Sequence, residues 1–375
     1  MELKIAIVIP CYNRTETLKK LYHSLVQAKY EHPVDLVFSI DNSGNNDVLH
    51  LVEGFQWVHG EKVIIHHKEN IGLRRNIISC GDLTSQYDAV IILEDDLLVS
   101  PYFFEYAHAA CQFYKNDEHI AGISLYSYRL CESLREFNPM TFGYDTYFMQ
   151  WTSSWGQMWT KSQWTAFKEW YEEHSEDISN IPIPDYVKSW THSWKKYHIA
   201  YLTDTNKYFV YPIESYTTIQ PSLGTHVSEV RLDKGYIVPL CNGIQRAFVF
   251  KNFDEEYAYD CFFELKKVLI DLNGNDVYAD LNLYGEKKKE NVHCEYFISS
   301  KPLSHAEIKK QWGISMIPLE KNILNSVGGS GLYMYESNSF SPVSLTPMEK
   351  VSFRIQLSET ERLSYYIHRL PALFK

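Results

Sequence analysis

Three carboxylates stand together in the sequence, Glu94, Asp95 and Asp96, directly after the apolar run 89–93. Adjacent carboxylates repel one another unless a cation lies among them. Oxygen ligands suit Mg²⁺ or Mn²⁺, and Mg²⁺ is commonly held by one or two carboxylates together with substrate phosphates. The motif therefore predicts a divalent-metal site for a diphosphate-bearing substrate. The alternatives are a solvated acidic turn, or the acidic pocket of a signalling domain with a similar topology.

The elements that must position these carboxylates are strands that end in polar clusters. The run 4–9 ends at Pro10, the run 34–40 ends at Asp41, and the run 62–66 is followed by the cluster 70–72. Apolar residues at helical spacing lie between these runs, and Asn13 with Glu16 has capping-box spacing. A Ser-Pro pair at 100–101 predicts a helix to about residue 114. Strands alternating with helices predict a doubly wound α/β fold, in which the strand-end clusters line one crevice.

Composition limits the classes of function. The chain has 375 residues, with 36 Lys and Arg against 47 Asp and Glu, so a net charge of −11 argues against a broad nucleic-acid surface. Aromatic residues make up 15%, which favours either flat surfaces of the kind that bind sugars or a Tyr-rich core. The seven cysteines include no C-x-x-C pair, and no secretory signal or membrane-spanning run is evident, so we expect a cytoplasmic protein.

The character of the sequence changes along the chain. We expect a nucleotide-binding and catalytic domain at 1–230, a smaller C-terminal α/β domain at 231–345, and an amphipathic helical tail at 346–375. Short strand-like runs at 268–272 and 295–298, with a turn at Asn273-Gly274, characterise the second domain. Its role is open between acceptor recognition and homodimerisation. The tail either docks on the protein or makes peripheral contact with a membrane.

Four motifs, taken in order, carry a resemblance to a known family. They are IAIVIPCYNR at 5–14, IDNS at 40–43, NIGLRRN at 70–76 and IILEDD at 91–96. Together they resemble the family 2-like glycosyltransferases of the GT-A fold. The acidic motif followed by SPYFF at 100–104 also resembles the N-acetylglucosaminyltransferase I relatives and bacterial sugar transferases. The resemblance covers about residues 1–230 and implies a GT-A fold, Rossmann-like with a mostly parallel sheet.

The resemblance implies roles for individual residues. Strand-end loops would hold the base, ribose and diphosphate of a nucleotide sugar, Trp155 and Gly156 would border the donor sugar, and Asp96 and His226 would hold Mn²⁺ or Mg²⁺. The nucleotide-sugar-binding residues implied in this way are Pro10, Tyr12, Arg14, Asp41, Asn42, Arg75, Glu94, Asp95, Trp155 and Gly156.

The catalytic base is the least defined residue. An inverting transfer needs a carboxylate that accepts the proton of the acceptor hydroxyl. Related enzymes carry an Asp after the Trp that matches Trp190, but this chain has Thr191 there. Asp185 is the nearest acid and our candidate base, with Asp145 and Glu173 as further candidates. Either the base has moved, or the mechanism differs from that of the relatives.

These observations predict a metal-dependent, inverting glycosyltransferase that moves a sugar from a UDP-sugar to a hydroxyl of a glycan or lipid-linked oligosaccharide. The resemblance implies an acceptor from capsule or lipopolysaccharide biosynthesis. Peripheral contact with the inner face of the plasma membrane is the alternative that the C-terminal tail offers. A sugar-1-phosphate nucleotidyltransferase is one alternative, but it would carry a Gly-rich basic loop where this chain has Pro10 to Asn13. A non-catalytic glycan-binding protein on the same scaffold is the other.

Overall fold

The structure is a computed structural model of the chain, and it describes residues 3–133, 135–220, 236–243 and 247–342. Its contacts divide the chain into two compact units. The first comprises Met1–Ser127 and Pro139–Lys266, and the second comprises Tyr128–Asn138 together with the chain from Lys267 onward. The second unit thus begins after Lys266 and also takes in Tyr128–Asn138, whereas the domain boundary is expected near residue 230 from the sequence.

The first unit is built on a nine-stranded sheet of described residues, in the order β11-β7-β9-β6-β8-β4-β1-β2-β3. A separate pair is formed by β5 and β10. The strands are β1 (Ile5–Cys11), β2 (Val34–Ile40), β3 (Lys62–His66), β4 (Ala89–Ile92), β5 (Leu97–Val99), β6 (Ile120–Ser124), β7 (Thr146–Met149), β8 (Gln157–Thr160), β9 (Tyr208–Pro212), β10 (Thr217–Ile219) and β11 (Ala258–Tyr259).

Parallel pairing of β1 with β2 and β4 positions the strand-end clusters. Ile7 of β1 lies opposite Leu36 on one side and Ile91 on the other, and all seven residues of β1 are buried. Such continuous apolar runs are typical of parallel strands covered on both faces. β8 runs antiparallel between β4 and β6. The ends of β1, β2 and β4 therefore meet at one edge of the sheet, as the sequence predicted.

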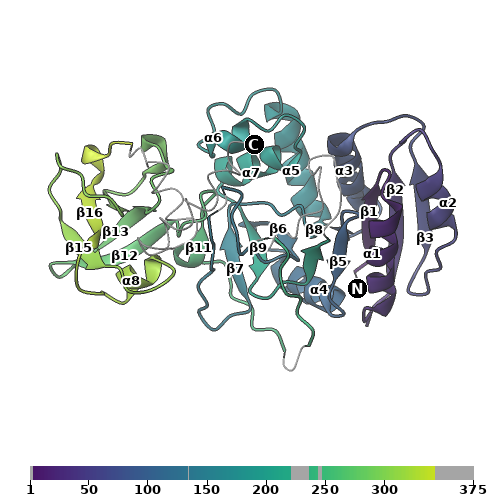
Figure 1. Cartoon of the computed structure of the whole chain (residues 1–375), viewed down its shortest axis with the longest axis horizontal. Helices are drawn as coiled ribbons and strands as arrows, with labels where there is room; N and C mark the ends of the chain where they lie inside the picture. The colour runs from purple at the N-terminus through teal and green to yellow at the C-terminus, as the bar shows by residue number, and fades with distance from the viewer. Residues whose placement is uncertain (1–2, 134, 221–235, 244–246, 343–375) are drawn as a thin grey trace, which may run out of the picture. The chain divides into compact units, whose positions relative to one another are not determined.

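Helices cover the sheet. Buried leucines of α1 and aromatic residues of α4 pack with Ile5, Ile7 and Ile9 in one core cluster. Figure 1 shows α5, α6 and α7 gathered together above β6, β8 and β9 in that view. The helices are α1 (Thr15–Gln27), α2 (Asp47–Glu53), α3 (Leu73–Asp82), α4 (Phe103–Tyr114), α5 (Lys161–His174), α6 (Asp185–Lys188), α7 (Lys195–Asp204) and α8 (Glu320–Leu324). Short 3₁₀ turns lie at Leu83–Ser85, Glu255–Tyr257, Lys289–Asn291 and Ser337–Ser339.

The capping box expected at Asn13 and Glu16 is not formed. Arg14 is the N-cap of α1 and makes no side-chain capping hydrogen bond. Its side chain instead reaches the carboxylates after β4. A complete capping box occurs at α5, where Thr160 and Gln163 satisfy each other's backbone N–H groups.

Most of the tryptophan-rich segment is core. Five of its members are buried and two, Trp155 and Trp190, are partly exposed. The buried ones are Trp151, Trp159, Trp164, Trp170 and Trp194. A packed layer therefore accounts for most of the segment, and the two partly exposed rings are the ones that a ligand could reach.

The second unit holds a five-stranded sheet of described residues, in the order β12-β13-β14-β16-β15. The expected turn joins β12 to β13, because Asn273 and Gly274 both have positive φ, at 57° and 85°. The strands are β12 (Lys267–Leu272), β13 (Asn275–Asn282), β14 (Tyr296–Ser299), β15 (Lys310–Gly313) and β16 (Gly331–Glu336).

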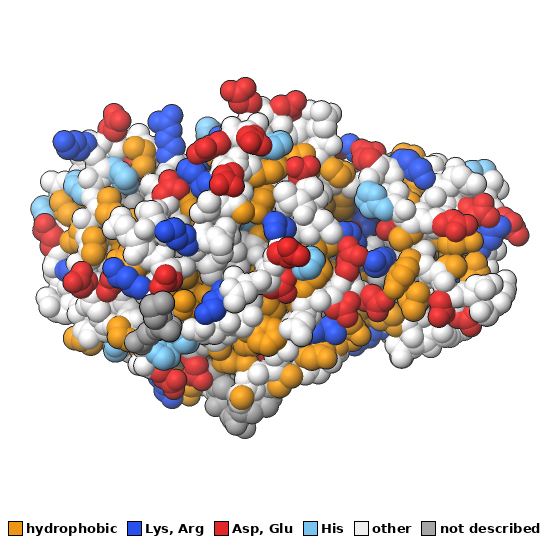
Figure 2. Space-filling model, turned by 180° about the vertical axis from the view of Figure 1, so that it is seen from behind, with side chains coloured by type: hydrophobic (Ala, Val, Ile, Leu, Met, Phe, Trp, Pro, Cys, Tyr) orange, Lys and Arg blue, Asp and Glu red, His pale blue; other side chains and the backbone are white. Residues whose placement is uncertain are grey.

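Within the described ranges, no helix combines the length and the apolar character that crossing a bilayer requires. The predicted tail helix at 346–375 lies outside the described residues. Figure 2 shows Lys and Arg side chains interspersed with Asp and Glu over one face, in keeping with the negative net charge.

Candidate active site

The carboxylates Glu94, Asp95 and Asp96 lie in the turn between β4 and β5. Leu97 N donates to Glu94 O at 3.2 Å, which closes the turn, and Gln220 N donates to Asp96 O at 2.8 Å. The buried Gln220 side chain also donates to the carbonyls of Thr17 and Leu97, at 3.1 and 2.8 Å. Backbone hydrogen bonds from β10's end thus fix the position of Asp96.

Arg14 is the cation of this cluster. One guanidinium nitrogen, Nη1, lies 3.1 Å from Asp95 Oδ1 and 2.5 Å from Asp96 Oδ2. Arg14 comes from the loop after β1, so these contacts join two strand ends whose residues lie 81 and 82 positions apart in sequence. The sequence placed both groups in one crevice, and the structure brings them together.

The electrostatics of the cluster favour protonation of its acids. Burial raises the pKa of Glu94 to about 8, and the charges of Asp96 and Asp95 add to this effect. Burial likewise raises the pKa of Asp95 to about 7, although Arg14 opposes the shift. The pKa of Asp96 is also raised by burial against the effect of Arg14. Additional positive charge among these carboxylates would therefore stabilise their ionised forms.

The donor set fits a divalent cation. Oxygens of two neighbouring carboxylates converge on a single cationic atom, Arg14 Nη1, and hard oxygen donors of this kind suit Mg²⁺ or Mn²⁺. Among the described residues, no group of three or more His, Cys, Asp and Glu side chains is arranged to hold a metal. Asp96 is one of the two expected metal ligands. His226, the other expected ligand, lies outside the described residues.

Asp41 has a structural task that the sequence did not reveal. Its buried carboxylate accepts hydrogen bonds from Ile71 N and Gly72 N, each at 2.8 Å, and from Asn42 N at 2.9 Å. These bonds tie the end of β2 to the loop before α3. Gly72 has φ of 80°, a conformation that favours glycine. A carboxylate has about four lone-pair sites, so Asp41 retains capacity for a ligand hydroxyl.

The other predicted nucleotide-binding residues surround this loop. Tyr12 is exposed, and its hydroxyl accepts a hydrogen bond from Asn70 Nδ2 at 3.2 Å. The amide of Asn42 donates to Lys68 O at 2.7 Å. Pro10 is buried within β1, whereas Arg75 is exposed at the start of α3. The exposed ring of Tyr12, beside the exposed amide of Asn70, is a surface on which a nucleotide base could stack.

Arg74, next to Arg75, connects α3 to the segment before α7. Its guanidinium donates to Thr191 O and lies 4.9 Å from the ring centroid of Tyr197. Thr191, where the relatives carry an acid, is thereby held beside the loop that precedes α3. The threonine side chain supplies no carboxylate.

Trp155 and Gly156 lie in the loop that leads into β8. The Trp155 ring packs against Tyr126 and Tyr236, with centroids 4.8 and 5.1 Å apart. Gly156 has φ of 100°, and a Cβ there would stand 2.8 Å from Thr217 Cγ2. Thr217 Oγ1 donates to Trp155 O at 2.5 Å. The glycine therefore allows β10 to fix the backbone of Trp155.

Lys195, the first residue of α7, is a buried cation that sequence reasoning missed. Its ammonium lies near the rings of Trp151, Trp155 and Trp190, and its charge acts on Glu94. The only signal in the sequence was its place directly after the tryptophan-rich segment.

Asp185, the candidate base, is the first residue of α6 and is exposed. Tyr186 of the same helix packs against Trp190, with ring centroids 6.1 Å apart. Of the other acids considered, Asp145 accepts a hydrogen bond from Val249 N at 2.6 Å, which is a structural role, and Glu173 is exposed on α5.

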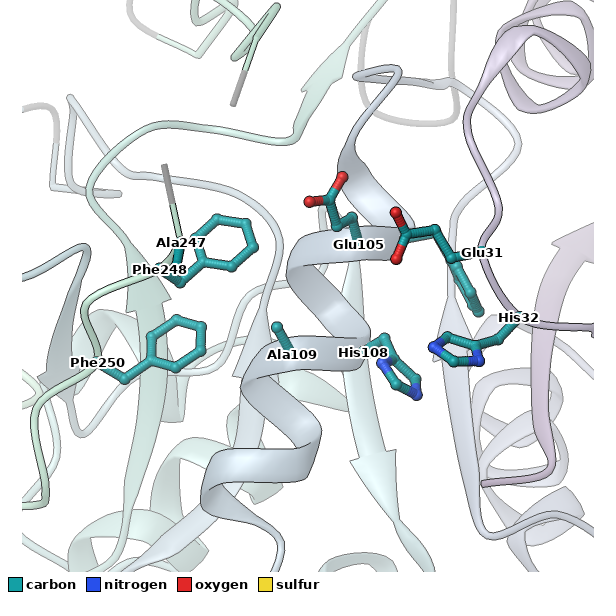
Figure 3. A pocket seen from close by; sticks show the side chains of 9 residues that line it. Glu31, His32, Glu105, His108, Ala109, Ala247, Phe248 and Phe250 are labelled. Carbon is teal, nitrogen blue, oxygen red and sulfur yellow. The ribbon is translucent and has the colours of Figure 1, made fainter. Parts of the chain in front are cut away.

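A cavity of about 350 Å³ lies elsewhere in the first unit, over α4. Figure 3 shows Phe248 and Phe250 on one side of the helix, and the imidazoles of His32 and His108 next to each other on the other side. Glu31 and Glu105 also line the cavity. None of the predicted site residues lines this cavity.

Residues 6–175 match the sequence model of the family described as glycosyl transferase family 2. This range contains β2 to β8, all of β1 except Ile5, and the three carboxylates after β4. The match confirms the resemblance that the four motifs indicated, and with it the GT-A type of α/β fold with an additional C-terminal domain. No curated protein matches the chain in sequence.

Several solved structures resemble the chain. The complex of S. aureus TarS 1-349 with UDP-GlcNAc matches with 15% identity and a TM-score of 0.40, over 61% of this chain and 62% of that one. GalNAc-T7 with UDP, GalNAc and Mn²⁺ matches with 12% identity and a TM-score of 0.41, over 56% of this chain and 42% of that one. The chain spans less than two thirds of the length of each of these proteins.

Proposed function

We propose that this chain, whose residues 6–175 match glycosyl transferase family 2, transfers a sugar from a nucleoside diphosphate sugar to a hydroxyl of a glycan acceptor. The observation that carries the proposal is the convergence of Asp95 and Asp96 on Arg14, within the segment that matches the family. A site of this charge suits a diphosphate together with a divalent cation. UDP is the nucleotide that the motifs favour.

Each group has a task in the proposed reaction. The Asp95 and Asp96 carboxylates would hold Mn²⁺ or Mg²⁺, which supplies a Lewis acid that neutralises the leaving diphosphate. The Arg14 guanidinium can exchange a carboxylate for phosphate oxygens, since its planar fork binds both groups well. Tyr12 offers an aromatic face to the base. Asp41 can accept a hydrogen bond from a ribose hydroxyl.

Inversion requires a carboxylate on the acceptor side of the crevice. We propose Asp185 for this task, because α6 contacts Trp190, a partly exposed ring of the tryptophan-rich segment. The acceptor hydroxyl would give its proton to Asp185 while the anomeric carbon is attacked from the face opposite the leaving group. A glycan or lipid-linked oligosaccharide of a capsule or lipopolysaccharide is the acceptor that the family resemblance suggests.

The experiment that tests this function is binding of UDP, GDP, dTDP and CMP by isothermal titration, with and without Mn²⁺, followed by hydrolysis assays of the matching nucleotide sugars. We expect one nucleoside diphosphate to bind and to bind more tightly with Mn²⁺. Arg75→Met should weaken that binding, and a matched change at the exposed Lys20 should not. Absence of binding to every nucleotide would contradict the proposal and favour a non-catalytic glycan-binding protein.

A further inference from the structure

The loop between β15 and α8 exposes large apolar side chains. Figure 1 labels both elements in the second unit, and residues 314–319 connect them. Ile314 is 51% exposed, Met316 40% and Ile317 53%. No other four consecutive residues of the described ranges hold more than one large hydrophobic side chain that is exposed to this degree. Single exposed apolar residues are ordinary on a protein surface, but a cluster of them marks a contact site. We call these three side chains the apolar patch.

The fold holds this loop in the conformation that exposes the patch. Asn322 of α8 is fully buried, and its Oδ1 accepts hydrogen bonds from Ser315 N at 2.7 Å and from Met316 N at 2.9 Å. Its Nδ2 donates to Met316 O at 2.9 Å and to Leu319 O at 3.0 Å. One buried amide thus makes four hydrogen bonds to the loop and fixes its backbone. Exposure of the patch is therefore built into the fold of the second unit.

The stretch of chain that carries the patch is positively charged. Residues 308–332 contain three lysines and one acid, Glu320, which is only 2% exposed. Lys321 is exposed, and its backbone N donates to Pro318 O at 3.1 Å, so this lysine directly follows the loop. Lys309 is ion-paired with two glutamates and adds little. The sign of this stretch is opposite to that of the whole chain, whose net charge is −11.

Charge complementarity selects the partner of the patch. A two-fold contact between copies of this chain uses the same surface of both, and would place two Lys321 side chains against each other. The segment 346–375 has five Lys and Arg against three Glu, so it would also bring positive charge. Anionic lipid headgroups are negative, and the boundary beneath them accepts apolar side chains to a depth of about 5–10 Å. An anionic lipid surface therefore suits both the apolar patch and its lysine.

We propose that the apolar patch inserts into the surface of a bilayer that contains anionic lipids, with the Lys321 ammonium at the level of the phosphates. Removal of the Ile and Met side chains from water supplies the main gain, and the lysine adds an attraction that salt weakens. A lysine can keep its ammonium among headgroups while its stem lies along apolar surface. This contact does not depend on the proposed function, because it uses only residues of the second unit.

Co-sedimentation of the full chain with vesicles tests the proposal. The probes are vesicles of phosphatidylcholine alone and vesicles that also contain about 30% phosphatidylglycerol. The patch variant is Met316→Thr together with Ile317→Thr. Its matched control is Leu269→Thr together with Tyr278→Thr, because these side chains are also exposed, at 44% and 39%, and lie opposite each other on β12 and β13 of the same unit.

We expect the wild-type protein to sediment with the anionic vesicles. The patch variant should lower the partition coefficient by about ten-fold or more, and the control should stay within about two-fold of wild type. Lys321→Glu should weaken binding to the anionic vesicles by about ten-fold and change binding to phosphatidylcholine alone by less than about two-fold. All the changed side chains are on the surface, so thermal unfolding should show every variant to be folded.

Four results would overturn the inference. The first three are a wild-type protein that does not sediment with anionic vesicles, binding that the folded patch variant leaves unchanged, and an equal loss of binding in the control. The fourth comes from analytical ultracentrifugation: a wild-type dimer that the patch variant converts to a monomer would assign the patch to a second copy of the chain. Unchanged binding in the patch variant would assign the lipid contact to another segment, such as 346–375.

Discussion

Arg14 Nη1 and Asp96 Oδ2 lie 2.5 Å apart, and the same nitrogen lies 3.1 Å from Asp95 Oδ1. One guanidinium nitrogen therefore serves two carboxylates that follow β4, and connects them to the loop after β1. A divalent cation bound at Asp96 Oδ2 would compete with this guanidinium for that oxygen. Arg14 is thus an internal counter-ion of the site as well as a candidate ligand for phosphate.

Removing this counter-ion should destabilise the fold. In Arg14→Met, three acids lose their nearest guanidinium, and we expect a loss of about 2 kcal/mol in the free energy of unfolding at pH 8. The loss is smaller than for a fully buried pair, because the Arg14 side chain is 27% exposed. Urea denaturation measures it. Arg75→Met, at an exposed arginine, should change stability by less than about 0.5 kcal/mol, and equal losses in both variants would contradict the counter-ion role.

The acids also predict how stability depends on pH. The pKa values of Asp95 and Glu94 in the folded protein are about 7 and about 8, above those of the unfolded chain, which are near 4. Between these values the folded protein binds more protons than the unfolded one, so stability should fall as pH rises from about 5 to about 8. We expect a fall of at least about 1 kcal/mol by urea denaturation without metal. Asp95→Asn should flatten this dependence, and a stability that rises over the same window would rule the explanation out.

Strand ends were the part of the site that the sequence could predict. Apolar runs followed by acids locate β1, β2 and β4, and parallel pairing then brings Arg14, Asp41 and Asp96 to one edge. The start of α1 was less predictable: Asn13 has the spacing of a cap, but Arg14 takes the N-cap position and directs its side chain to Asp95 and Asp96. Long-range contacts carry no local signal. Lys195 lies near the rings of Trp151, Trp155 and Trp190 because α7 packs on the sheet, and the only sign of this in the sequence is its place after the tryptophan-rich segment.

Asp41 should be essential to the loop before α3 as well as to nucleotide binding. Asp41→Ala removes the acceptor for Ile71 N and Gly72 N, and hydrogen bonds to a charged acceptor contribute about 1.5–3 kcal/mol each. We expect Asp41→Ala to lose about 2 kcal/mol of stability and to exchange the amide hydrogens of Ile71 and Gly72 faster. Hydrogen exchange measures the second effect. Asp41→Asn keeps one acceptor oxygen and should lose less, and unchanged exchange in Asp41→Ala would refute the structural role.

The metal prediction is tested at Asp96. Asp96→Ala should abolish the gain in nucleotide affinity that Mn²⁺ provides, because it removes an oxygen donor from the cation-binding pair. Isothermal titration of the preferred nucleoside diphosphate, with and without Mn²⁺, gives the comparison directly. Asp117→Ala, a change to a partly buried surface acid after α4, is the control and should keep the metal effect. If Mn²⁺ still tightens binding in Asp96→Ala by the wild-type factor, Asp96 is not a metal ligand.

The glycine before β8 should be intolerant of any side chain. Alanine at Gly156 would place its Cβ 2.8 Å from Thr217 Cγ2, at a φ of 100° that L-residues rarely adopt. We expect Gly156→Ala to cost about 2 kcal/mol in stability and to weaken binding of the nucleotide sugar more than that of the nucleotide, because Trp155 moves with its backbone. Gly44→Ala is the control, because Gly44 also has positive φ but has open space around its Cβ position. Its loss of stability reports backbone strain alone, without the steric conflict. Equal losses of affinity for the nucleotide and for the nucleotide sugar would contradict a contact between Trp155 and the sugar.

Asp185 is the candidate base, and its test must separate chemistry from binding. Asp185→Asn keeps the size of the side chain and removes its ability to take a proton, so we expect donor affinity to stay within about two-fold and transfer to fall by about 10²–10⁴-fold. Single-turnover transfer to the acceptor, measured beside the titration, gives both quantities. Asp177→Asn, at an exposed acid before α6, is the matched control and should transfer normally. Wild-type turnover in Asp185→Asn would move the base to another acid of the crevice, because Thr191 carries no group that can take the proton at neutral pH.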